Sequence, residues 1–198
     1  MEGILYYWLM WAAWIIATFL LKKSVMRFSC SLFILTNILV SGLFVVVAHF
    51  NISISYFLFL MCGFFLAVYK NNYTFGIFIT SIALTFAYAG ILLIRLYDPV
   101  WFIIDSVWIM SFVIGALSIY LGQTVTAQFS YYLIAICQGE FLYWFVLGQF
   151  HQHLIIGSTE FLDITVVGCA FIFIWNAYSH VVVMLENNLQ KPIKEKQG

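Results

Sequence analysis

Glu140 is the residue with the clearest potential for chemistry, because its carboxyl group lies inside the long apolar run 127–147. At the centre of a membrane a charged side chain costs about 2.5–3.5 kcal/mol, so such a residue normally faces the interior of a helix bundle. Asn37 and Asn176 lie near the middle of two other apolar runs and are possible partners. The three residues form a candidate intramembrane polar site for a proton or a cation on a solute pathway. The alternative is an interhelical hydrogen bond that only fixes the packing.

A second group of polar residues lies between the last two apolar runs and at the start of the last one. Its members are His151, His153, Glu160 and Asp163. Imidazoles and carboxylates together can bind zinc or another divalent cation. An H-x-H pair in a loop is a weak signal, however, and surface loops are generally polar. The sequence therefore predicts no metal site and no cofactor, with these four residues as the weak candidates for a metal.

Motifs of common enzyme classes are missing from the sequence. It has no H-E-x-x-H, G-x-S-x-G, Walker A loop or dinucleotide-binding glycine pattern. Ser179 and His180 are adjacent, which does not suit the serine–histidine pair of an intramembrane protease. Acidic and basic side chains are balanced, eight of each, and no basic patch indicates nucleic acid. The sequence therefore favours a role that is neither enzymatic nor nucleic-acid binding.

The composition indicates a membrane protein. Hydrophobic residues make up 65% of the 198 residues and charged residues only 8%, whereas a soluble domain carries about 25% charged residues. The mean hydropathy is +1.04. A soluble fold of this composition would expose large apolar patches to water, whereas lipid is compatible with an apolar surface.

Short polar breaks divide the chain into apolar runs of helix length. About 20 helical residues cross a bilayer, and the runs cover residues 3–21, 28–48, 54–69, 74–94, 100–121, 127–147 and 161–185. Membrane strands would instead alternate apolar and polar residues in shorter segments. We therefore expect an all-α polytopic bundle of seven spans in one domain, residues 1–186, followed by a short cytoplasmic tail, residues 187–198.

Lys and Arg in the breaks predict the orientation. With the N-terminus outside and the C-terminus inside, only Arg95 lies on the outer side. The cytoplasmic side receives Lys22, Lys23, Arg27, Lys70, Lys191, Lys194 and Lys196. This distribution follows the positive-inside rule. Run 54–69 is the shortest, so six spans is the alternative. Arg95 and Asp98, at the end of one run, favour a local ion pair.

Small residues predict where helices pack. Ser81, Thr85 and Ala89 recur every four residues in run 74–94, and Ala135 and Gly139 do so in run 127–147. Small side chains let helix backbones approach closely in lipid. We therefore expect these faces to contact other helices.

The opening segment MEGILYYWLMWAAWIIATFLL, with its aromatic-rich first span, resembles the YphA family of small membrane proteins of Bacillus-type bacteria. Chain length and span pattern are similar as well. The resemblance implies a multi-pass protein of the bacterial cytoplasmic membrane, in a family without a characterised molecular role. It implies no active-site residues.

Two functions remain open on the sequence alone. The first is a non-enzymatic membrane bundle that acts through contacts with lipid or another membrane protein; short loops and the missing catalytic motifs favour it. The second is a small-solute or proton-coupled transporter, or the membrane subunit of one, with Glu140 in its path. A water-accessible cavity reaching Glu140 would favour the second, and a dry, tightly packed centre would exclude it.

Overall fold

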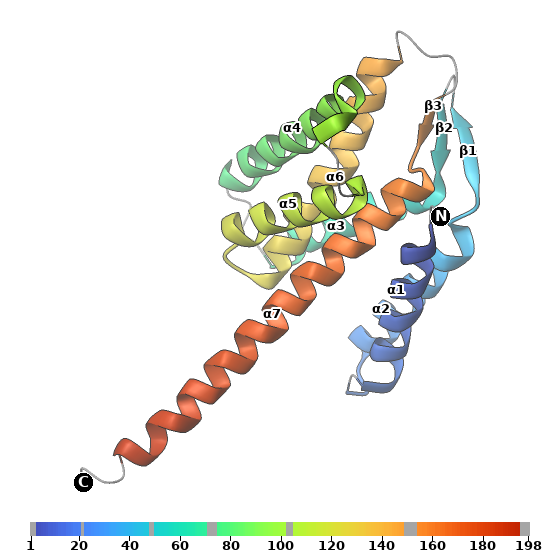
Figure 1. Ribbon diagram of the computed structural model, residues 1–198. Helices are drawn as coiled ribbons and strands as arrows, with labels where there is room; N and C mark the ends of the chain where they lie inside the picture. The colour runs from blue at the N-terminus through green and yellow to red at the C-terminus, as the bar shows by residue number, and fades with distance from the viewer. Residues whose placement is uncertain are drawn as a thin grey trace.

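The computed structural model of the chain describes residues 3–20, 22–47, 50–70, 75–101, 105–148 and 154–194 (Figure 1). Within these ranges it contains seven α-helices, one for each predicted apolar run. They are α1 Ile4–Ile15, α2 Val25–Val40, α3 Ile54–Lys70, α4 Phe75–Tyr97, α5 Ser106–Leu121, α6 Val125–Leu147 and α7 Thr159–Lys194. A π-helical segment, Ile16–Leu20, continues α1, and a 3-10 turn, Pro99–Trp101, follows α4. Helix α7 thus continues beyond residue 186, where the sequence predicts the end of the bundle.

Capping side chains fix the starts of three helices. Ser24 accepts a hydrogen bond from the backbone N–H of Arg27 at the start of α2. Asp105 and Thr124 do the same at the starts of α5 and α6. Such caps satisfy backbone donors that have no partner within the helix. These polar residues therefore determine where each apolar helix begins.

Helix α6 is the centre of the bundle. It packs against α3, α4, α5 and α7, and most of its side chains from Ala127 to Glu140 are buried. At Gly139 an added Cβ would lie 3.0 Å from the carbonyl oxygen of Thr85, so α4 and α6 approach closely there. This contact confirms the predicted packing of the small-residue faces of the two helices.

Helices α1 and α2 form a hairpin beside this group, and α1 packs against α7 (Figure 1). Near one end of the hairpin the hydroxyls of Tyr7 and Ser41 are hydrogen-bonded at 2.8 Å. Near the other end the Arg27 guanidinium donates to the carbonyl oxygen of Thr18. The two helices therefore run antiparallel, and their connection lies at the end that carries Lys22 and Lys23.

A small sheet corrects the predicted all-α class. Strand β1 (Phe44–Val47) pairs antiparallel with β2 (Phe50–Ser53), and β2 pairs in parallel with β3 (Leu154–Ile156). The predicted run 28–48 is therefore wrong as a single helix, because α2 ends at Val40. The β-branched residues 45–47 favour an extended chain, and β2 supplies the backbone hydrogen-bond partners of β1. The sheet lies close to the start of α7 (Figure 1).

Two described helices are both long and apolar enough to cross a membrane, at Phe78–Tyr97 and Thr159–Glu186. Four more apolar helical segments are shorter, at Ile4–Leu20, Val25–Val40, Ile54–Tyr69 and Ser106–Leu121. Helix α6 has 23 residues, and the polar side chains of Gln128, Gln138 and Glu140 make it less apolar.

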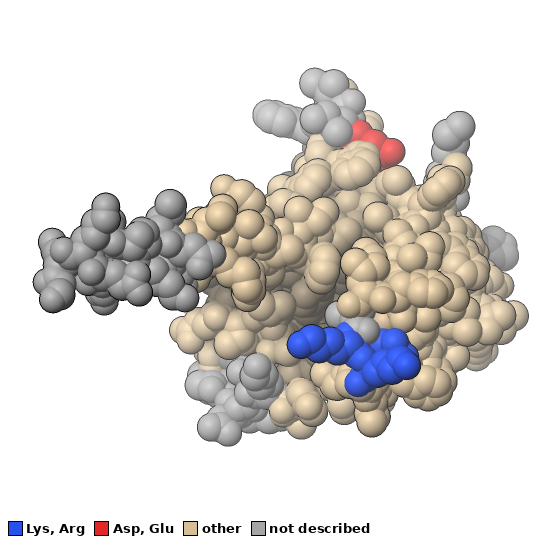
Figure 2. All heavy atoms as spheres, turned by 90° about the horizontal axis from the view of Figure 1, so that it is seen from below, with Lys and Arg blue, Asp and Glu red and all other residues tan. Residues whose placement is uncertain are grey.

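The surface of the described part is rich in large apolar side chains, among them Trp8, Phe19 and Leu39, each more than 70% exposed. Seen from below, it carries one patch of Lys and Arg side chains on a mostly uncharged face (Figure 2). The patch belongs to the α1–α2 connection, where Lys22 and Lys23 are exposed and Arg27 is half-buried. The N-terminus lies near the sheet, and the C-terminus lies at the opposite end of the molecule (Figure 1).

Candidate functional site

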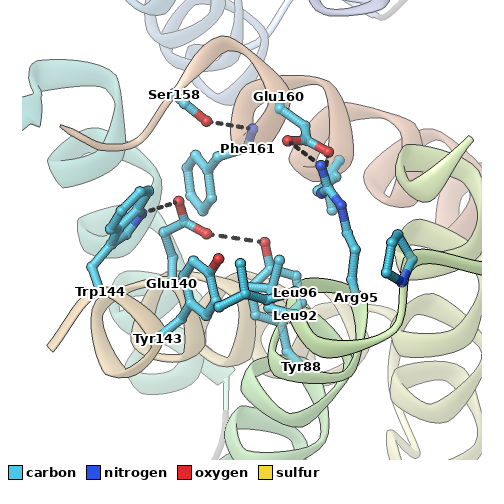
Figure 3. A pocket seen from close by; sticks show the side chains of 12 residues that line it. Tyr88, Leu92, Arg95, Leu96, Glu140, Tyr143, Trp144, Ser158, Glu160 and Phe161 are labelled. Carbon is cyan, nitrogen blue, oxygen red and sulfur yellow. Dashed lines mark hydrogen bonds and ion pairs between the residues drawn. The ribbon is translucent and has the colours of Figure 1, made fainter. Parts of the chain in front are cut away.

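A pocket of about 410 Å³ lies where α4 and α6 end and α7 begins (Figure 3). It is at the same end of the bundle as the sheet, since Ser158 in its wall follows β3 directly. Its lining consists of Tyr88, Leu92, Arg95, Leu96, Pro99, Glu140, Tyr143, Trp144, Ser158, Glu160, Phe161 and Ile164. The rim residues Leu96 and Pro99 are exposed, whereas Tyr88 and Phe161 at the floor are buried. The pocket therefore leads from the surface to buried polar groups.

The carboxylate of Glu140 lies in this pocket and is only 5% exposed. Its Oε1 accepts a hydrogen bond from the indole Nε1 of Trp144 at 3.0 Å. Its Oε2 accepts one from the hydroxyl of Tyr88 on α4 at 3.3 Å. Trp144 is four residues further along α6 and so lies on the same face of the helix. Both partners are neutral donors, which orient the carboxylate without neutralising it.

Arg95 and Glu160 form an ion pair across the same pocket. The guanidinium Nη1 contacts Oε1 of Glu160, and Nη2 donates to Oε2 at 3.1 Å. The hydroxyl of Ser106 also donates to Glu160, at 2.8 Å. The pair therefore joins α4 to α7, with α5 attached through Ser106. The predicted local pair of Arg95 with Asp98 is wrong, because the described Asp98 carboxylate instead accepts from the backbone N–H of Val100.

The structure does not bring Asn37 and Asn176 to Glu140. Asn37 is buried in the α1–α2 hairpin, where its amide donates to the carbonyl oxygen of Phe33 at 3.0 Å. The amide of Asn176 donates to Oε1 of Gln128 at 2.7 Å and so joins α7 to α6. Asn176 lies in the middle of α7 as expected, whereas Asn37 lies in the last turn of α2, because that helix ends at Val40. Each of the three residues belongs to a different helix pair.

The weak metal candidates are also distributed over different roles. Glu160 is the partner of Arg95. Asp163 is buried and accepts hydrogen bonds from the backbone N–H groups of Gly3 and Tyr6. His151 and His153 lie outside the described residues. In the described part of the chain no three His, Cys, Asp or Glu side chains are close enough together to hold a metal ion.

Aromatic side chains form much of the wall, and sequence reasoning missed their role. Tyr88, Tyr143, Trp144 and Phe161 line the pocket beside Glu140 (Figure 3). The spacing of four residues between Glu140 and Trp144 is a signal that could have identified one donor. Nothing in the sequence singles out Tyr88, because its contact depends on how α4 crosses α6.

The amino-acid sequence is similar to a known protein family over nearly its whole length. A family model described as YphA-like integral membrane protein matches residues 2–198. The chain belongs to this family. It is similar to "Uncharacterized protein YphA" of Bacillus subtilis (strain 168), with 33% identity over 181 residues, which cover 91% of this chain and 90% of the relative. No solved structure matches the chain.

Membership of the YphA-like family confirms the resemblance seen in the opening segment. The chain is therefore a mostly helical integral membrane protein. The family description and the similar Bacillus protein carry no molecular function that could be transferred to it.

Proposed function

We propose that the chain crosses the bacterial cytoplasmic membrane seven times, with its N-terminus outside and residues 187–198 as a cytoplasmic tail. The exposed Lys22 and Lys23 support this orientation, because they lie at the far end of α1 from Gly3. Gly3 in turn is hydrogen-bonded to Asp163 near the start of α7. The N-terminus, the sheet and the pocket then share the outer side, and the basic patch lies at the cytoplasmic side.

We further propose that the protein binds a small solute in the pocket at Glu140, as a transporter or as the membrane subunit of one. The single observation that carries this proposal is a pocket of about 410 Å³ that ends at a buried carboxylate. Small-molecule sites typically measure about 300–1,000 Å³ and combine apolar walls with a few polar groups. A cavity reaching Glu140 is also the feature that separates solute binding from a packed, purely structural bundle.

Contact with lipid or another membrane protein is the second candidate function. It is favoured by the middle of α7, where Phe173, Ile174, Trp175 and Tyr178 are all exposed. An apolar face of this kind suits lipid or a partner helix. The two functions are compatible, because a solute-binding membrane subunit works together with a partner.

A test of the pocket uses Leu92→Cys and Leu84→Cys as a matched pair. Both leucines are buried on α4, two turns apart, but only Leu92 lines the pocket. Leu84 instead packs with Ala135 of α6. Because Cys30 is exposed, both variants are made with Cys30→Ser, and the single Cys30→Ser variant is the blank.

Intact cells are then treated with membrane-impermeant methanethiosulfonates that carry either an ammonium or a sulfonate group. We expect Leu92→Cys to react from outside and Leu84→Cys to stay as unreactive as the blank. Equal lack of reaction at both positions, in variants that melt as cooperatively as the parent protein, would contradict a solute pocket open to the outer face.

A further inference from the structure

The charges that line the pocket do not balance. Arg95 is the one cation in the lining, and Glu140 and Glu160 are both acidic, so the formal charge of the lining is −1. Arg95 uses two guanidinium nitrogens on Glu160. Such a bidentate pair is a strong, geometrically specific arrangement, and it leaves no side-chain cation in the lining for Glu140.

Glu140 has unused capacity to accept hydrogen bonds. An ionised carboxylate offers about four acceptor positions; Tyr88 and Trp144 occupy two of them, and the backbone N–H of Gly157 approaches a third. The carboxylate points into the space between Trp144, Tyr143 and Tyr88 (Figure 3). A buried carboxylate without a cationic partner is costly. Either a bound proton or a positively charged group in this space removes that cost, and a cationic solute would take the place of the proton.

The walls around this position suit a cation as well. Tyr88, Tyr143, Trp144 and Phe161 line the pocket, and a cation within about 6 Å of an aromatic ring face gains from the ring quadrupole. Leu92 and Ile164 add apolar surface beside them. An anion would find its natural partner, Arg95, already paired and would be repelled by Glu140.

We infer that the pocket recognises a small organic cation, with an ammonium group against Glu140 and an apolar body between the aromatic walls. This inference rests on the proposed solute-binding function and names the chemical class of the solute.

The main test is binding to the purified full-length protein in lipid nanodiscs. Three probes of similar shape are compared by the thermal unfolding midpoint: 2-phenylethylamine (cationic), 2-phenylethanol (neutral) and phenylacetate (anionic). We expect only the amine to raise the midpoint in a saturable manner. Glu140→Gln keeps the size of the side chain but removes its charge. The apparent affinity of this variant for the amine should fall at least about tenfold, because the attraction between two unit charges a few ångströms apart inside a protein exceeds the free energy of a tenfold change. Glu186→Gln, the same change at an exposed site outside the pocket, should leave the affinity unchanged.

Three outcomes would overturn the inference: the alcohol or phenylacetate stabilises as strongly as the amine, Glu140→Gln keeps the full affinity, or no probe shifts the midpoint. In each case the labelling of Leu92→Cys still reports separately whether the pocket is open, so failure of the cation inference is distinguishable from failure of the proposed function.

A second measurement does not depend on the folding of Glu140→Gln. The rates of the ammonium and sulfonate thiol reagents are compared at Leu92→Cys, each normalised to the exposed Val100→Cys. The same thiolate attacks the sulfur of both reagents and displaces the same methanesulfinate leaving group, so the ratio of the two rates reports the local charge. We expect the ammonium reagent to be favoured by about tenfold. A normalised ratio of one would overturn the cation inference but not the open pocket. No reaction with either reagent would overturn both the cation inference and the proposed solute pocket.

Discussion

The carboxylate of Asp163 in α7 accepts a hydrogen bond of 2.6 Å from the backbone N–H of Tyr6 in α1. The same carboxylate accepts one of 2.7 Å from the N–H of Gly3, a residue with φ of +89°. Asp163 therefore supplies, from a distant helix, the cap that the first turn of α1 lacks in its own sequence. This contact attaches the α1–α2 hairpin to the start of α7, next to the sheet.

We predict that Asp163→Ala lowers the free energy of unfolding by about 1–3 kcal/mol, because it leaves buried backbone donors without a partner. Denaturation in nanodiscs measures the change. Asp98→Ala is the control, since Asp98 accepts a single exposed hydrogen bond from Val100, and its effect should stay within about 0.5 kcal/mol. Equal effects of the two substitutions would contradict a capping role for Asp163.

Close packing of α7 on α6 gives a second prediction. An added Cβ at Gly168 would lie 1.8 Å from the hydroxyl oxygen of Tyr132, which is fully buried and donates to the carbonyl oxygen of Ile164. Gly168→Ala should therefore destabilise the protein by about 3 kcal/mol. At Gly90 on α4 nothing lies within 4 Å of the added atom, so Gly90→Ala should stabilise by about 0.5–1 kcal/mol through the lower entropy of the unfolded chain. A comparison of the two unfolding midpoints checks both signs, and a neutral Gly168→Ala would count against the observed α6–α7 contact.

The seven-span topology predicts which side of the membrane three exposed positions occupy. Val100→Cys, between α4 and α5, should react with an impermeant maleimide in intact cells. Lys22→Cys and Gln123→Cys should react only after permeabilisation, because both positions lie on the proposed cytoplasmic side. If α3 did not cross, Lys22→Cys and Gln123→Cys would be found on opposite sides, which would contradict seven spans in favour of six.

The helices could be predicted from the sequence because their apolar runs are long and the breaks between them carry polar residues. Phe50–Ser53 could not be assigned to a strand on this basis, since its parallel partner Leu154–Ile156 lies about a hundred residues further along the chain. In Phe44–Val47 every residue is apolar, so periodicity cannot separate a strand from the end of a helix. The contact that makes Phe50–Ser53 the central strand joins segments far apart in the sequence, and such a contact leaves no local signal.

The candidate site was predictable only in part for the same reason. Glu140 stands out because a carboxylate is rare in an apolar helix. Its partner Tyr88 and the pairing of Arg95 with Glu160 depend on helix rotation and crossing, which hydrophobicity does not define. Asn37 and Asn176 were natural candidates by depth in the membrane, but depth alone does not decide which helix face meets which.

The central claim is that a solute-binding pocket ends at Glu140. The most direct test is to identify what occupies this pocket. An experimental density map of the full-length protein in lipid nanodiscs, fine enough to show ordered water, would reveal it. We predict density for water or a small polar solute within about 2.7–3.2 Å of the Glu140 carboxylate. A lipid acyl chain in the pocket, or Trp144 and Phe161 packed together with no space beside Glu140, would contradict the account.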